Sequence, residues 1–186
     1  VHKNHRPKRP MQINFNRQRK LILWLWFSSI YFYALPSVFA EEIYKTIIID
    51  NKEMVIRVFS AKSPLLLLWL PSETEMGEEQ FSVAQSLSEQ GIAVWFPDIL
   101  GSLFLPQVSS SLSHISPKLI AALMEDASKQ KAKLFLFAEG DGVMTALSGA
   151  MAFRQQHPES EVLGGVISLS GKYFIGTPAV GQKPQW

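Results

Sequence analysis

A five-residue turn carries the clearest indication of chemistry in this chain: Ala138, Glu139, Gly140, Asp141 and Gly142. It lies between an apolar run typical of a strand and a run typical of a helix, with small residues at both of its ends. In enzymes that form a covalent intermediate at such a turn, the central position holds a nucleophilic Ser, Cys or Asp. Here the central residue is Gly140, which has no side chain and cannot attack a substrate.

Carboxylates beside the turn are the candidates to replace the missing nucleophile. Asp141 is the strongest, but a turn centred on it would have the large residues Glu139 and Val143 at its ends. We therefore expect Asp141 to begin the helix, where the helix dipole favours an acid. Glu139 is expected either at the mouth of the same pocket or as a solvated loop residue. Asp98 follows another strand, where ligand sites gather, or simply forms a turn after Pro97.

Strand and helix patterns alternate along the chain and must position this turn. Continuous apolar runs are typical of strands buried on both faces of a parallel sheet, and a spacing of three or four is typical of a helix face. A Ser-rich segment, 101–116, is expected to be a loop. The patterns predict a hairpin over 44–49 and 54–59, buried strands over 65–70, 92–96, 133–137 and 162–169, and helices over 77–90, 118–129 and 143–156.

This order predicts an α/β fold: a three-layer sandwich with a mostly parallel sheet and an antiparallel N-terminal hairpin. Over residues 43–170 the order resembles the first six strands of the α/β-hydrolase fold, with residues 138–142 as its nucleophile elbow. Residues 96–101, Phe-Pro-Asp-Ile-Leu-Gly, are similar to the turn after the fourth strand of that family. The resemblance implies an esterase or peptidase type of ancestor.

Several departures from the family argue against activity. The family also needs an acid after a later strand and a histidine after the last strand. His114 lies in the Ser-rich loop and His157 ends a helix, so neither matches that place. The segment after the third strand normally helps to bind the oxyanion. Here it carries Glu73 and Glu75, and carboxylates would repel such a charge.

The C-terminal part of the sequence lacks a regular pattern after residue 170. The family has further strands at this point, and the tail 176–186 is rich in Gly and Pro. We therefore expect residues 41–186 to be an incomplete α/β-hydrolase-like domain. A natural minimal domain is the alternative.

The N-terminal 40 residues form a separate segment with its own charge. They hold seven Lys or Arg and no acid, whereas the rest has 11 basic and 16 acidic residues. From a start at Met11, the basic residues 17–20, the apolar run 21–35 and the exit 36–40 follow the order of a signal peptide. We expect export to a periplasm. The alternative is an inner-membrane anchor formed by residues 21–40, the one way in which we expect the chain to contact a membrane.

Composition excludes several other classes of protein. The absence of cysteine excludes disulfides and thiolate zinc sites, and we expect neither a metal nor a cofactor. No basic patch follows residue 40, which argues against nucleic-acid binding. The sequence thus favours an exported hydrolase-like protein, inactive as it stands, whose substrate is unknown. The alternative is a non-catalytic binding or scaffold domain, in which Gly140 and Gly142 let a small anion approach the helix amides.

Overall fold

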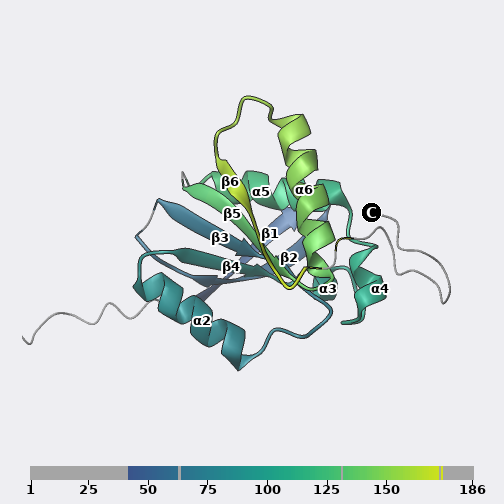
Figure 1. The fold of residues 1–186 in the computed structure, drawn as a ribbon, viewed down its shortest axis with the longest axis horizontal. Helices are drawn as coiled ribbons and strands as arrows, with labels where there is room; N and C mark the ends of the chain where they lie inside the picture. Colours follow the sequence, from purple (N-terminus) through teal and green to yellow (C-terminus); the bar gives the residue numbers. More distant parts are fainter. Residues whose placement is uncertain (1–41, 63, 131, 172, 174–186) are drawn as a thin grey trace, which may run out of the picture. The chain divides into compact units, whose positions relative to one another are not determined.

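A six-stranded mixed sheet forms the centre of the fold (Figure 1). The computed structural model describes residues 42–62, 64–130, 132–171 and 173. The predicted signal peptide, the boundary at residue 40 and the tail 176–186 lie outside these residues and stay predictions. The strand order is β1-β2-β4-β3-β5-β6. The strands are β1 (Glu42–Ile49), β2 (Lys52–Phe59), β3 (Leu65–Trp69), β4 (Ala93–Pro97), β5 (Lys133–Glu139) and β6 (Leu163–Leu169).

The first two strands form the predicted antiparallel hairpin. Ile49 pairs with Lys52, so the connection has two residues, Asp50 and Asn51. Both have positive φ, 50° and 61°. A two-residue turn of this type matches the right-handed twist of the strands, and Asn and Asp tolerate it best after Gly. Strand β2 also pairs with β4, in antiparallel orientation. The four strands β4, β3, β5 and β6 are parallel to one another.

Helices cover both faces of this sheet, which confirms the three-layer prediction (Figure 1). Helix α2 (Glu78–Glu89) packs on one face, against β2 and β4. Helices α5 (Pro117–Ser128) and α6 (Gly142–Gln156) pack against each other on the opposite face. Their ends follow local rules. At the start of α5, the Ser116 hydroxyl accepts a hydrogen bond from the backbone N–H of Lys118, and Pro117 is the first helical residue. Just after the end of α2, Gly91 has a φ of 87°.

The position of strand β3 in the sheet explains why its sequence is continuously apolar. Leu66, Leu68 and Leu70 belong to the core under α5 and α6, whereas Leu67 and Trp69 belong to the core under α2. Successive side chains of a strand point to opposite faces, so a strand covered on both sides needs apolar residues at every position. Burying each such side chain contributes about 1.5–3 kcal/mol. This strand is therefore central to both halves of the core.

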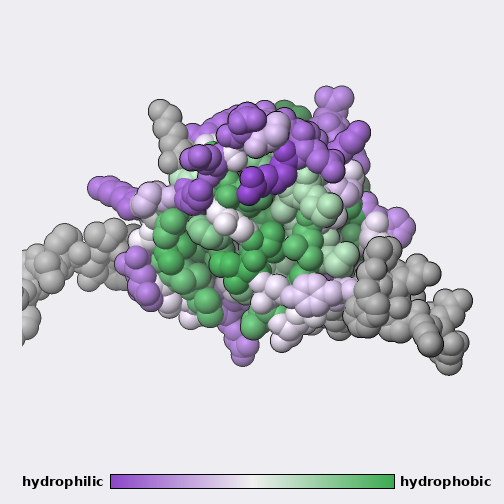
Figure 2. All heavy atoms as spheres, turned by 45° about the horizontal axis from the view of Figure 1, so that its top comes forward, coloured by the Kyte–Doolittle hydropathy of each residue, from purple (hydrophilic) through white to green (hydrophobic). Residues whose placement is uncertain are grey.

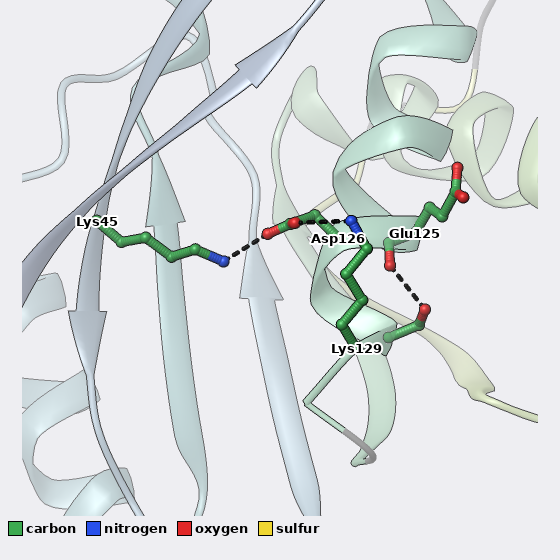
Figure 3. Close-up of polar contacts among 5 residues, drawn as sticks. Lys45, Glu125, Asp126 and Lys129 are labelled. Carbon is green, nitrogen blue, oxygen red and sulfur yellow. Dashed lines mark hydrogen bonds and ion pairs between the residues drawn. The ribbon is translucent and has the colours of Figure 1, made fainter.

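An ion pair ties the edge of the sheet to the helical layer (Figure 3). Lys45 of β1 lies 2.5 Å from Asp126 of α5 and 4.4 Å from the ring centroid of Trp95. Lys129 also bonds to Asp126, at 3.1 Å. Burial by itself raises the pKa of Asp126, but the hydrogen bonds from the two lysines outweigh it, and the pKa lies below its ordinary value.

Two predictions about the elements were wrong. The segment 101–116 is not wholly a loop, because it overlaps α3 (Ile99–Ser102) and contains α4 (Ser109–Leu112), whose Leu112 is buried. Strand β6 is not buried on both faces. It pairs with β5 alone among the described strands, and its Ile167 and Leu169 are 46% and 54% exposed. An apolar run cannot distinguish a central strand from an edge strand.

The surface of the molecule carries a broad apolar area. Figure 2 shows it in green on one face, bordered by purple polar side chains. In the part of the chain that the structure describes, no helix combines the length and the apolar character that a membrane span requires.

Candidate functional site

The turn at residues 138–142 has the geometry of a tight strand-to-helix connection. Strand β5 ends at Glu139 and α6 begins at Gly142, so Gly140 and Asp141 alone make the turn. Gly140 has φ of 55°, in the left-handed region that favours glycine. Its N–H donates to the carbonyl of Leu169 in β6, at 3.1 Å. The sharp strand-to-helix turn expected of a nucleophile elbow is therefore present, and glycine adopts the left-handed backbone at its centre without strain.

The carboxylate of Glu73 occupies the space beside Gly140. A Cβ placed on Gly140 would lie 2.5 Å from Glu73 Oε2 and 2.8 Å from the carboxyl carbon, too close for real atoms. The same Oε2 accepts a hydrogen bond of 2.9 Å from the backbone N–H of Asp141. Glu73 thus puts its carboxyl group where a side chain at the centre of the turn would begin.

The loop that carries Glu73 is held at several points. Ser72 is 2% exposed, and its hydroxyl lies 2.9 Å from that of Thr74. The side-chain amide of Gln107 donates to the carbonyls of Ser72 and Thr74, at 2.8 and 3.1 Å. These bonds on both neighbours of Glu73 hold the loop backbone beside the turn. Sequence reasoning missed Gln107, since nothing in its local pattern indicates a contact with residues far along the chain.

Comparisons with known proteins identify the fold. No family model matches the sequence, and no curated protein matches it. The structure is similar to a dienelactone hydrolase from Anabaena variabilis, with 16% identity and a TM-score of 0.52 over 72% of this chain and 64% of that one. It is also similar to a cold-adapted esterase from an Arctic intertidal metagenomic library (13%, TM-score 0.51, 70% and 61%). An epoxide hydrolase from Vigna radiata matches as well (20%, TM-score 0.50, 70% and 40%).

The chain has the α/β-hydrolase fold. The predicted fold class and the resemblance are thereby confirmed. The chain spans less than two thirds of the length of each of these three hydrolases. Identities this low establish the fold and leave the chemistry to be argued from the site itself.

In the α/β-hydrolase fold, the backbone N–H after the nucleophile is one donor of the oxyanion hole. The corresponding donor here is Asp141 N, and it already bonds to the Glu73 carboxylate. An oxyanion at this point would therefore have to compete with Glu73 for this donor. The acidic loop was predicted to oppose an oxyanion, and the structure brings Glu73 to the turn. Glu75, the other predicted acid, is exposed and lines a separate cavity at β2 and β4.

The remaining residues of the elbow have structural partners. Ala138 is fully buried in the core, and Glu139 is half-buried beside Leu169 in the sheet. The carboxylate of Asp141 accepts a hydrogen bond from the Ser109 hydroxyl of α4. A Cβ on Gly142 would collide with the carbonyl oxygen of Pro71, so the last residue of the elbow must be glycine for steric reasons.

Other titratable residues singled out in the sequence have local partners. Asp98 begins α3 and accepts from Gly101 N at 3.0 Å, which is the turn-forming role. His114 Nδ1 lies 3.0 Å from the carbonyl of Ser110. His157 packs its ring against Phe153, with centroids 4.8 Å apart, at the opposite end of α6 from the elbow. Over the described ranges, no three His, Asp or Glu residues are grouped as metal ligands would be.

Proposed function

We propose that this chain is an exported α/β-hydrolase-fold protein that does not hydrolyse esters or peptides. The observation that carries the proposal is the contact between the Glu73 carboxylate and the elbow at Gly140 and Asp141. It supports inactivity twice, because a nucleophile at position 140 would have to displace the Glu73 side chain and an oxyanion donor is already used. Loss of one such donor alone typically lowers kcat by about 10²–10³-fold.

Hydrolysis assays test this proposal directly. The full chain is incubated with nitrophenyl esters of short and medium acyl chains and, separately, with a fluorescent phosphonate that labels activated serines. We expect no turnover above the buffer rate and no labelling. Asp141→Asn is the matched variant, because it removes the charge of the strongest remaining candidate and keeps its shape. Turnover that is present in the parent and lost in Asp141→Asn would restore the enzymatic reading.

Export is the second part of the proposal. It is supported by the basic, apolar and small-residue segments within residues 1–40. Expression of the full chain in a Gram-negative host, followed by fractionation and N-terminal sequencing, tests it. We expect a periplasmic product beginning at Glu41. A product in the membrane fraction that retains residues 21–40 would instead support the anchor, and a cytoplasmic product would contradict export altogether.

Binding of a small molecule is the second candidate function. An anion that entered the glycine turn would meet the Glu73 side chain beside Gly140 and the carbonyl oxygen of Pro71 beside Gly142. These contacts disfavour binding of an anion at the turn. A different observation favours binding: a cavity of about 350 Å³ between β2, the end of β4 and α2.

A further inference from the structure

A cavity lies beside β2 and the end of β4, whereas the elbow follows β5. Its volume of about 350 Å³ is at the lower end of the range of small-molecule sites, which is about 300–1,000 Å³. Buried apolar residues form much of its wall: Pro71, Phe96, Ile99 and Leu100. Phe81 and Met76 add partly buried apolar surface from α2 and the loop before it. The wall thus suits the apolar part of a small ligand.

Arg57 of β2 brings a positive charge into this apolar wall. Among the described residues that line the cavity, it is the only base. Its side chain is 23% exposed, and its guanidinium carbon lies 3.6 Å from the ring centroid of Phe81. The rings of Phe59 and Tyr44 lie further away, at 5.6 and 6.0 Å. The Phe81 ring is thus in close contact with the guanidinium, and this contact reduces the freedom that Arg57 would lose on binding a partner.

Glu42 forms an ion pair with one side of the Arg57 guanidinium. Arg57 Nε lies 2.7 Å from Glu42 Oε1, close enough for an ion pair, although the buried N–H does not point at that oxygen with hydrogen-bond geometry. The Arg57 guanidinium lowers the pKa of Glu42, so the pair is ionised at neutral pH. The terminal nitrogens of Arg57 make no hydrogen bond or ion pair with any described residue. Donors suited to a carboxylate therefore remain available.

Two carboxylates among the lining residues work against an anion. Glu75 and Asp98 are both exposed, and Asp98 already accepts a hydrogen bond from Gly101 N. Solvent and salt screen exposed charges much more than buried ones, which weakens the repulsion from Glu75 and Asp98. Glu75 and Asp98 are expected to reduce the affinity of the cavity for an anion. Removing either carboxylate should therefore raise that affinity.

We propose that this cavity binds a small carboxylate that carries a flat apolar group. The carboxylate would bond to the terminal nitrogens of Arg57, and the flat group would pack against the wall that includes Phe96 and Met76. A planar fork facing a carboxylate permits two parallel hydrogen bonds, which a lysine could not make. This inference is independent of the elbow, so it can fail while the proposed inactivity stands, and the reverse.

Three probes of the same size and different charge test the proposal. Phenylpropanoate, phenylpropanol and phenylpropylamine are titrated into the full chain by calorimetry at low ionic strength. We expect the carboxylate to bind at least about tenfold more tightly than the alcohol, which corresponds to one charge-assisted hydrogen bond. The amine is expected to bind more weakly than either. An amine or alcohol that binds as tightly as the carboxylate would overturn the proposal, as would the absence of binding by all three.

Variants separate Arg57 from the rest of the cavity. Arg57→Gln should weaken binding of the carboxylate at least about tenfold and leave that of the alcohol unchanged. Arg57→Lys should retain part of the effect. Glu75→Gln is the matched control, and it should strengthen carboxylate binding about twofold to threefold by removing an exposed like charge. Since Arg57→Gln leaves Glu42 without its partner, Glu42→Gln/Arg57→Gln provides a second variant that keeps the fold. Unchanged carboxylate affinity in that double variant would overturn the assignment.

Discussion

The carboxylate of Glu73 stands in the space that any side chain on Gly140 would need, and it bonds to the next backbone N–H of the elbow. Glycine at this position therefore does more than leave the turn without a nucleophile, because a side chain of the neighbouring loop fills the space beside it. We therefore expect that a serine at residue 140 would not by itself make the elbow active. The contact also stabilises the turn, since a backbone donor that would otherwise lack an acceptor is satisfied.

Gly140→Ser should destabilise the protein by about 2–4 kcal/mol, from a left-handed backbone and from steric conflict with Glu73. Urea unfolding of the full chain measures this free energy. Gly91→Ser is the matched control, because Gly91 also has positive φ but a Cβ there would meet nothing within 4 Å. Gly91→Ser should lower the free energy of unfolding by about 1 kcal/mol, because its only effect is to place a non-glycine residue at positive φ. Equal costs at both positions would mean that Glu73 does not obstruct the elbow.

Adding Glu73→Ala to Gly140→Ser should recover part of the lost stability. The two residues are in contact, so their effects should differ from a simple sum by at least about 1 kcal/mol. A double-mutant cycle with the single variants measures this coupling energy. Strictly additive effects would contradict the close contact on which the proposed inactivity rests.

Gly149→Ala should destabilise the packing of α5 on α6 by about 1–3 kcal/mol, despite the higher helix propensity of alanine. The reason is that a Cβ on Gly149 would collide with the side chain of Ile120 in α5. Thermal unfolding followed by circular dichroism measures the change. Met151→Ala in the same helix is a suitable control, because Met151 is 63% exposed and should change stability by less than about 0.5 kcal/mol. A stabilised Gly149→Ala would show that the helices have room to separate.

Asp126→Asn should lower the free energy of unfolding by about 1–2 kcal/mol at neutral pH, since it removes a charged partner of Lys45 and Lys129. The folded-state pKa of Asp126 is lowered, so its contribution is fully present above the unfolded pKa of about 3.9. It is lost as the pH falls through the lower, folded pKa. In unfolding measurements the difference between parent and variant should therefore begin to shrink below about pH 4 and be lost only below the folded pKa.

Glu125→Gln provides the control for this pH dependence. The side chain of Glu125 points away from the ion pair in Figure 3, and its contact there is made by its backbone carbonyl with Ser128. Its substitution should leave the curve of stability against pH almost unchanged. A difference between parent and Asp126→Asn that does not change with pH, or that is already lost above about pH 4, would contradict the lowered pKa.

Strands β3 and β6 show how far local sequence can predict this fold. Both are apolar runs, and both were predicted as buried parallel strands. The prediction is confirmed for β3, which has strands on both sides and helices on both faces. It is wrong for β6, which lies at the edge of the described sheet. Hydrophobicity along a segment favours a strand, whereas its place in the sheet depends on what other segments provide.

For the site as well, the local sequence of the loop after β3 does not determine where its two acidic side chains lie. Glu73 and Glu75 are two residues apart, and sequence reasoning expected both near the elbow. The structure places Glu73 against Gly140 and Asp141, whereas Glu75 lines the cavity with Arg57. The direction of each side chain depends on how the loop is held by Gln107, 33 residues from Thr74, which no local pattern predicts.

The sequence by itself determined the order of strands and helices and the absence of a nucleophile at Gly140. These properties depend on residue type and on spacing between neighbours along the chain. Tertiary structure alone decided that Glu73 fills the vacant space and that Arg57 faces an apolar cavity. Glu73 and Asp141 are 68 residues apart, and only the parallel arrangement of β3 beside β5 brings the loop and the elbow together. Contacts across such a distance follow from packing of the whole sheet, which no single segment encodes.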